Sequence, residues 1–218
     1  IPYVWPKNIL KDKSLDIGFD PKIFTSETLK IYFGDTSNLL PINENLFKQN
    51  NEIINKNNLV YSIDSSVSGE SVKNKIERLI KIIDKNKIDN LYISSGENVC
   101  WLLNIRGKDL PNSPVANFQA IITKTKNIFL LGNIKKLKNL KKKFSKEKIR
   151  FFEIDKFFEI LNLLKSKNFC IDGKTCSVLN ENLIHSKFSI KGRVDPIYSL
   201  KAIKNKTEIK NMINAHIE

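Results

Sequence analysis

The sequence predicts an α/β fold, with a mixed sheet and helices packed on both of its faces. Three observations carry this prediction. Strand-like and helical segments alternate along most of the chain, as in folds whose strands are covered by helices. Two apolar strand-like runs, residues 118–123 and 127–131, are separated by three residues, a spacing typical of an antiparallel hairpin. With 218 residues, 41% of them hydrophobic, the chain can bury a substantial core in one or two domains.

The first predicted elements lie before residue 60. Residues 16–20 have the pattern of a short strand, and Thr25 or Ser26 can cap the helix that follows. Residues 39–42 form a second candidate strand. The stretch 43–58 is polar and rich in asparagine, so we interpret it as a connection between two units.

Helical periodicity becomes clear after Ser68. Apolar residues three and four positions apart mark one face of a helix that ends near Lys87. This face consists of Val72, Ile76, Leu79, Ile80 and Ile83. Residues 91–95 then have the pattern of a strand. A helix that leads into a buried strand supports the α/β prediction.

Residues 134–148 combine an apolar stripe with a dense group of lysines. The stripe consists of Ile134, Leu137, Leu140 and Phe144, at helical spacing. We predict an amphipathic surface helix whose lysines face solvent. Binding of phosphate groups or of a membrane surface by these lysines is the alternative.

The next segments continue the alternation. Residues 149–154 are strand-like, and Asp155 can cap a further helix. Residues 168–172 have the pattern of another strand, followed by a turn at Gly173. The apolar residues expected to anchor the intervening helix are Phe158, Leu161 and Leu164.

A last helix is predicted from a capping box, in which Asn205 is followed three residues later by Glu208. Its residues Ile209, Met212, Ile213 and His216 share one face. We expect this face to have nothing left to pack on within the chain.

The net charge of +14 suggests a nucleic-acid-binding module, because clustered cations bind phosphates. However, the lysines are scattered, and only four of the 37 basic residues are arginine. Biased composition explains this distribution better, so nucleic acid is not the expected partner. No stretch approaches the roughly 18 consecutive apolar residues of a membrane helix, so we expect no membrane span.

The cysteines indicate a reducing compartment. Cys100, Cys170 and Cys176 are odd in number and lie in apolar surroundings, which does not fit a disulfide scaffold. We therefore expect a cytoplasmic protein. Since the sequence starts at Ile1 without methionine and ends within a predicted helix, we also expect it to be a fragment.

A search for catalytic chemistry assigns no catalytic residue and no metal ligand in this chain. His185 and His216 belong to no known metal or catalytic motif. Glycine-rich phosphate loops and nucleophile elbows are absent from the sequence. Acids occur at strand ends, at Asp64, Asp89 and Asp172, and an RNase H-like nuclease would use such converging carboxylates to hold two metal ions. We favour the interpretation that they are turn and capping residues.

Residues 97–115, with the sequence ENVCWLLNIRGKDLPNSPV, join an apolar run to an arginine, a glycine and two prolines. Together with residues 120–122, this block resembles the second-domain motif of three-domain Xaa-Pro aminopeptidases, the aminopeptidase P group of the creatinase and prolidase superfamily. Residues 200–217, with Glu208 and Met212, are similar to the segment by which those enzymes enter their "pita-bread" catalytic domain. Residues 17–21 resemble the strand that closes their first domain.

The resemblance implies a creatinase/prolidase N-terminal domain with an RNase H-like motif. It places the end of a first domain in residues 1–65, the second domain in 66–195, and a linker with the first catalytic-domain helix in 196–218. The catalytic domain, whose acids and histidine bind two divalent metals, usually manganese, would lie outside this chain, so the chain should be inactive alone. The implied substrate is a peptide with proline in second position, and the implied assembly is a homodimer.

The sequence departs from the family at two places. Ser113 stands before Pro114 where the family usually has asparagine, and residues 117–119 replace a stretch that contains an aromatic residue. Either change could alter the lining of the substrate cleft.

For the segment 101–115, which we call the corner, the resemblance implies a loop at the mouth of the active site. Arg106 is the first candidate for substrate binding: its guanidinium could bind a carboxylate of the substrate or of the catalytic domain, or it could bind backbone carbonyls and fix the turn. Trp101 could form the cleft wall or belong to the core. Asn104 and Asp109 are further candidates, and both residue types are also common in turns.

Three hypotheses remain open at this point. The chain could be the N-terminal region of an Xaa-Pro aminopeptidase, a basic nucleic-acid-binding module, or a free-standing interaction domain. Under the first, residues 1–65 should be partly disordered or packed against the second domain, because an incomplete sheet leaves unpaired edges.

Overall fold

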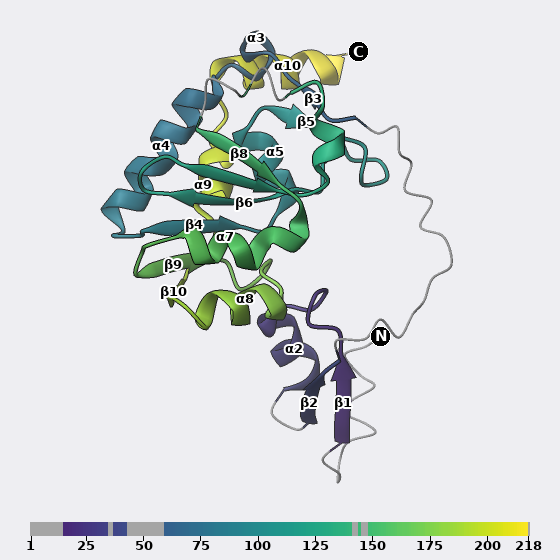
Figure 1. Cartoon of the computed structure of the whole chain (residues 1–218). Coiled ribbons are helices and arrows are strands. Elements are labelled where there is room, and N and C mark those ends of the chain that lie inside the picture. Colours follow the sequence, from purple (N-terminus) through teal and green to yellow (C-terminus); the bar gives the residue numbers. More distant parts are fainter. Residues whose placement is uncertain (1–14, 35–36, 43–58, 141–143, 145–147, 218) are drawn as a thin grey trace.

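The computed structural model describes residues 15–34, 37–42, 59–140, 144 and 148–217. Its centre is a six-stranded mixed sheet in the order β10-β9-β4-β6-β7-β8, flanked by helices (Figure 1). The strands are β4 (Asn90–Ile93), β6 (Gln119–Thr123), β7 (Ile128–Leu131), β8 (Ile149–Phe152), β9 (Asn168–Ile171) and β10 (Ser189–Gly192). The predicted α/β fold with a mixed sheet is therefore confirmed.

Each face of the sheet forms its own core. Residues of β4 alternate between the two faces: Leu91 and Ile93 belong to one cluster of buried residues, and Tyr92 belongs to the other. Helices α4 (Val72–Lys85), α5 (Gly96–Leu102) and α9 (Pro196–Ala202) cover the first face. Helices α7 (Phe157–Leu163) and α8 (Val178–His185) cover the second. Because both faces are covered, nearly every residue of the central strands is buried.

The hairpin prediction is confirmed. Strands β6 and β7 pair antiparallel, and β4 pairs antiparallel with β6. The other pairs, β4 with β9, β9 with β10 and β7 with β8, are parallel. Lys126 closes the hairpin with a φ of 65°, so a non-glycine residue adopts the left-handed region in this turn.

The segment 134–148 differs from the predicted helix. Its first part is a short 3₁₀ helix, η1 (Ile134–Leu137), and residues 141–143 and 145–147 lie outside the described part of the chain. The apolar stripe is nevertheless right, since Leu137, Leu140 and Phe144 are buried. The solvated interpretation is wrong for Lys136, whose side chain is only 15% exposed and pairs with Asp109.

The segment 149–163 also differs from the predicted strand and helix. Strand β8 ends at Phe152, and Ile154 belongs to a 3₁₀ helix, η2 (Ile154–Lys156), that leads directly into α7. Asp155 lies inside this turn and caps nothing. The buried face of α7 is formed by Phe157, Ile160 and Leu161, whereas the expected anchor Phe158 is 45% exposed.

The N-terminal described residues form a small unit. Strand β1 (Leu15–Phe19), helix α2 (Ser26–Phe33) and strand β2 (Ser37–Pro41) make a two-stranded parallel sheet with its crossover helix, capped by Thr25 as predicted. This unit contacts α8 in Figure 1 and through the hydrogen bonds of Val178 N to Phe24 O, 2.9 Å, and of Leu179 N to Pro21 O, 2.8 Å. The described residues of this unit are thus joined to α8, one of the helices that cover the larger sheet.

The last helix, α10 (Lys206–Ile217), begins with the predicted capping box: the Asn205 amide donates to the Glu208 carboxylate and the Glu208 amide to Asn205 Oδ1, each at 2.9 Å. The expectation that it has nothing to pack on is wrong. It lies against the short helix α3 (Ser65–Ser68), and Asn205 Nδ2 donates to Ser68 O at 2.9 Å. The apolar side chains of α10 are still about half exposed.

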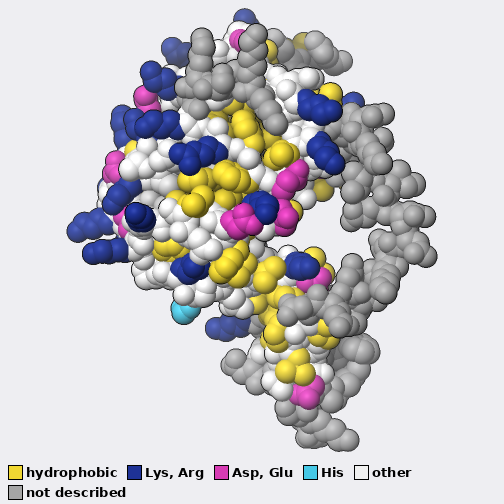
Figure 2. Space-filling model, in the orientation of Figure 1, with side chains coloured by type: hydrophobic (Ala, Val, Ile, Leu, Met, Phe, Trp, Pro, Cys, Tyr) yellow, Lys and Arg dark blue, Asp and Glu magenta, His cyan; other side chains and the backbone are white. Residues whose placement is uncertain are grey.

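Lysine and arginine side chains are spread over the face drawn in Figure 2 and lie among polar and apolar side chains. This agrees with scattered lysines more than with a concentrated basic surface. Among the described helices, none combines the length and the apolar composition needed to cross a bilayer.

Candidate functional site

The corner begins where α5 ends. After Leu102 the chain turns at Asn104, whose φ is 50°, and enters β5 (Ile105–Arg106), which pairs antiparallel with β3 (Tyr61–Ser62). Helix α5 places Trp101 beside this turn. The turn thus brings three of the four candidate residues, Trp101, Asn104 and Arg106, to one region of the molecule.

Asn104 is a turn residue, as expected, and also joins separate elements. It is 5% exposed, and its Nδ2 donates to Glu70 O at 2.8 Å. Its backbone carbonyl oxygen accepts a hydrogen bond from the backbone amide of Ile63 at 2.7 Å. Its Oδ1 accepts a 2.7 Å hydrogen bond from Lys75 Nζ. A side chain with this many partners holds the corner to α4 and to the segment before it.

Lys75 is the residue of this region that the sequence analysis missed. It is 1% exposed, and its Nζ donates to Trp101 O at 2.9 Å and lies 4.1 Å from the centre of the Trp101 ring. Burial lowers the pKa of the Lys75 ammonium to about 8, while the carboxylates of Glu208 and Glu70 act in the opposite direction. The signal in the sequence was spacing, since Lys75 stands three residues after Val72 and four before Leu79 on the apolar face.

Arg106 makes the contacts of the turn-fixing interpretation. Its Nη1 donates to the carbonyl oxygens of Ile105 at 2.8 Å and Cys100 at 3.3 Å. The following Gly107 lies so close to Ala116 that a Cβ would stand 2.7 Å from the Ala116 Cβ, which explains the glycine. These contacts leave other guanidinium donors unused, and the substrate-binding role of Arg106 stays a prediction.

Asp109 closes the loop of the corner. One carboxylate oxygen accepts the amide of Asn117 at 2.9 Å, and the other pairs with Lys136. The Asp109 amide donates to Val115 O at 3.0 Å. Both carboxylate oxygens of Asp109 are therefore engaged within the chain. Unlike Trp101, Asn104 and Arg106, Asp109 does not line the cavity that lies beside the corner.

A cavity of about 250 Å³ lies beside the corner, between β5, α3, α4, α5 and α10. It is lined by Ile63, Val67, Ser68, Lys75, Trp101, Asn104, Arg106, Lys204, Glu208, Asn211 and Met212. We call it the corner cavity. Three cations and one carboxylate face it, and its remaining walls are apolar, amide or hydroxyl side chains, so its charge favours an anionic group.

The acids that follow strands are structural, as the turn interpretation predicted. Asp64 caps α3 by accepting the amide of Ser66 at 2.8 Å, and Asp172 accepts the amides of Lys174 and Asp195. Within the described ranges, no three His, Cys, Asp or Glu side chains come close enough to hold a metal ion together.

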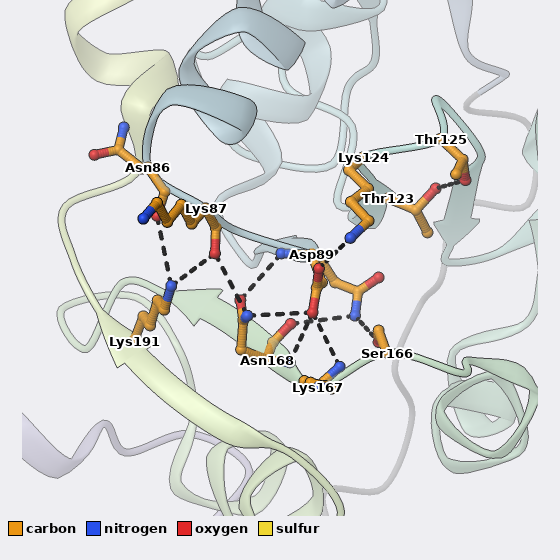
Figure 3. A network of polar contacts seen from close by, with 11 residues as sticks. Asn86, Lys87, Asp89, Thr123, Lys124, Thr125, Ser166, Lys167, Asn168 and Lys191 are labelled. Atoms are coloured by element: carbon orange, nitrogen blue, oxygen red, sulfur yellow. Dashed lines mark hydrogen bonds and ion pairs between the residues drawn. The ribbon is translucent and has the colours of Figure 1, made fainter.

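Asp89 belongs to a polar network at the start of β4, the end of the strand away from the corner (Figure 3). Its carboxylate accepts the amide of Lys167 at 3.0 Å and pairs with Lys124 Nζ at 2.6 Å, joining β4 to its neighbours on both sides. The hydrogen bond from Lys124 lowers the pKa of Asp89. The network explains Asp89 without a metal ion.

The three cysteines behave as small buried side chains. Cys100, Cys170 and Cys176 are free, and burial raises the pKa of each thiol, to about 11 for Cys170 and about 12 for Cys176. Thiols in this state are poor nucleophiles at neutral pH.

A family model described as the Creatinase/Prolidase N-terminal domain matches residues 53–208. The chain belongs to this family. The resemblance seen in the sequence is thereby confirmed, and the mixed sheet with helices on both faces is the creatinase/prolidase N-terminal fold.

Curated relatives of this creatinase/prolidase chain are Xaa-Pro aminopeptidases. Xaa-Pro aminopeptidase 1 of Dictyostelium discoideum is 28% identical over 214 residues, which cover 97% of this chain and 32% of the relative. A probable Xaa-Pro aminopeptidase P of Pyricularia oryzae is 27% identical, over 92% of this chain and 36% of its own. This creatinase/prolidase chain thus spans about a third of the length of these relatives.

Among solved structures, the X-prolyl aminopeptidase of Caenorhabditis elegans matches 95% of this chain with 36% of its own, at a TM-score of 0.79 and 22% identity. That protein is described as a cytosolic enzyme with a di-nuclear active site. At this level of identity the match establishes the fold of the creatinase/prolidase chain.

Proposed function

We propose that this chain is the non-catalytic N-terminal region of a metal-dependent Xaa-Pro aminopeptidase, which removes the first residue from peptides with proline in second position. One observation carries the proposal: sequence similarity to Xaa-Pro aminopeptidases extends over nearly the whole chain but only a third of those relatives. In this proposal residues 1–65 end a first domain, 66–195 form a second, and 196–218 lead into the catalytic domain.

The metals belong to the catalytic part of the longer protein. The described residues of this chain do not fit a di-metal site, because they bring no three ligand side chains together. When bound there, two divalent ions, manganese in our proposal, would activate the attacking water. We also propose that the longer protein is cytoplasmic and acts as a homodimer.

The corner contributes to the substrate cleft in this proposal. Arg106 has guanidinium donors that its two carbonyl contacts do not use, and Trp101 offers an aromatic wall beside it. Asn104 and Asp109 would act on the substrate through the shape of the loop, since the side chains of both are hydrogen-bonded within the chain. Ser113 belongs to the same loop, and residues 117–119 lead from it into β6; both would adjust the lining of the cleft.

The test uses the longer protein, loaded with manganese, in three forms: the wild type, Arg106→Ala, and Arg150→Ala as a matched arginine control. Arg150 lies on β8, away from the corner. A charged hydrogen bond is worth about 1.5–3 kcal/mol, so Arg106→Ala should lower kcat/KM on Xaa-Pro peptides by roughly 10- to 150-fold, and Arg150→Ala should leave it unchanged.

Two results would contradict the proposal in different ways. Unchanged kinetics of Arg106→Ala would make the corner a structural turn only. A longer protein that shows no release of the first residue from Xaa-Pro peptides would overturn the assigned activity itself.

A further inference from the structure

The corner cavity has the chemistry of a binding site, and the proposed function does not say which chemical group it would take. It lies where α10 and α3 meet the β3 and β5 strands, at the top of Figure 1. Its apolar walls include Ile63, Val67 and Met212. An aromatic ring, that of Trp101, adjoins them. Such walls suit a ligand with a hydrocarbon part.

The charged groups of the cavity are unbalanced. Lys75, Arg106 and Lys204 are positive and Glu208 is negative. None of the three cations takes part in the ion pairs found among the described residues. Lys204 Nζ donates to a backbone carbonyl, that of Lys201, at 2.6 Å. Glu208 already accepts the Asn205 amide in the capping box, so the cavity has a net excess of positive donors.

Trp101 supplies a donor without an acceptor. Its Nε1 is buried and has no hydrogen-bond partner in the part of the chain that the structure describes. A buried indole N–H normally finds an acceptor, because leaving it unpaired costs about 1–3 kcal/mol. Because this atom has almost no exposed surface, a ligand in the cavity would contact the Trp101 ring and not its N–H.

We propose that the corner cavity binds a carboxylate that carries a short apolar group. The carboxylate would accept from the guanidinium donors of Arg106 that its two carbonyl contacts do not use, and would lie near Lys75 and Lys204. The hydrocarbon part would contact the Trp101 ring, Val67 and Met212. At about 250 Å³ the cavity is slightly below the usual range of ligand pockets, roughly 300–1,000 Å³, so it fits a small acid or one acidic side chain. The inference shares Arg106 and Trp101 with the substrate cleft of the proposed function and names the chemical group they would bind, but it does not require aminopeptidase activity.

The first experiment titrates the 218-residue chain with 4-methylpentanoate, followed by proton–nitrogen correlation NMR. The uncharged 4-methylpentanamide is the control. The chain has two tryptophans, Trp5 and Trp101, so the spectrum of Trp101→Phe assigns the indole signal. Saturable movement of the Trp101 indole signal with the acid, and none with the amide, is the expected result, because the indole ring lines the cavity. No shift of that signal would overturn the proposal.

Variants then test the assigned partners. Arg106→Met removes a donor to the charged carboxylate and should weaken binding about tenfold or more. Lys204→Met should weaken it a few-fold, because Lys204 is exposed to solvent screening. Lys206→Met, an exposed lysine outside the lining, is the matched control and should have no effect. Equal affinity of all variants would overturn the assignment, provided that their spectra remain dispersed.

The same titration of the longer protein distinguishes the two sources of the carboxylate. If the ligand is a free acid, the longer protein binds 4-methylpentanoate as the 218-residue chain does. If an acidic side chain of the remaining polypeptide fills the cavity, only the 218-residue chain binds it. Both outcomes support the carboxylate site. Neither depends on whether the longer protein hydrolyses Xaa-Pro peptides, so the two proposals can fail separately.

Discussion

Lys75 shows how one buried charge organises the corner. Its ammonium group is removed from water, which is costly, and two hydrogen bonds together with the Trp101 ring offset part of that cost. Because these partners come from α5 and from the turn at Asn104, Lys75 fixes both relative to α4. The lowered pKa indicates that the offset is incomplete.

We therefore expect the stability of the protein to rise with pH between about 8 and 10.5. In this window the folded state has already lost the Lys75 proton, whereas the unfolded chain still binds it, so the free energy of unfolding increases with pH. The full shift corresponds to roughly 3 kcal/mol. Urea unfolding of the wild type, Lys75→Met and the exposed-lysine control Lys81→Met, measured from pH 7 to 11, checks this.

The comparison isolates Lys75 from the other groups that titrate at high pH. Lys75→Met lacks donors for Asn104 Oδ1 and Trp101 O, which shifts its stability by a constant amount. Relative to Lys75→Met, the wild type and Lys81→Met should both become more stable above pH 8. If the free energies of unfolding of the wild type and of Lys75→Met change with pH in parallel, burial of the Lys75 ammonium does not destabilise the folded state.

At the scale of elements, helix α10 depends on a junction with α3. Gly69 ends α3 with a φ of 73°, a conformation that favours glycine. A Cβ at Gly69 would overlap the side-chain amide of Asn205, which both caps α10 and donates to Ser68 O. The end of one helix and the start of the other are thus held by the same contact.

Gly69→Ala should loosen α10. The left-handed backbone and the displaced Asn205 side chain together cost about 1–3 kcal/mol. Hydrogen exchange of the amides in residues 206–217 should therefore become faster, while the amides of β4 and β6 keep their protection. Gly173→Ala is the matched control, because Gly173 has no positive φ and no atom within 4 Å of the added Cβ. Equal exchange of α10 in both variants would rule out the coupling.

The elements that could be predicted are those with a complete local signal. Helix α4 has five apolar residues at helical spacing and a Ser71 cap, and α10 has its capping box. Helix α5 was missed because it has only seven residues and begins with glycine, and β3 and β5 are two residues each. Such short elements exist through tertiary contacts, here those of Asn104, which no local pattern encodes.

The candidate site was predictable only in part for the same reason. The unusual arginine and the prolines pointed to the corner, and three of its four candidates do line one cavity. Lys75 reaches the cavity on α4, whereas Lys204 and Glu208 come from the distant end of the chain and are brought there by the packing of α10 against α3. Asp109 was grouped with the others because it is near them in sequence, although its carboxylate faces Lys136.

At the scale of the whole molecule, two units meet at α8. The unit formed by β1, α2 and β2 is too small to be stable alone, since a two-stranded sheet needs further packing. It is connected to α8 by the amides of Val178 and Leu179, by a bridge between Thr25 and Ser177, and by a hydrogen bond from Ser26 to Glu181. We therefore expect the small unit to depend on α8 for its stability and to unfold locally before the main sheet does.

Val178→Pro tests this connection without breaking α8. Val178 is the first residue of the helix, a position where proline is tolerated, and Ser177 before it is extended, with a ψ of 150°. The substitution removes the hydrogen bond to Phe24 O, worth about 1 kcal/mol.

Exchange of the amides in residues 15–34 should become about fivefold faster in Val178→Pro, while the amides of β4, β6 and β9 remain protected. Ser65→Pro, at the first position of α3, is the matched control and should leave exchange in residues 15–34 unchanged. Unchanged exchange in Val178→Pro as well would mean that the small unit is held by contacts other than those with the start of α8.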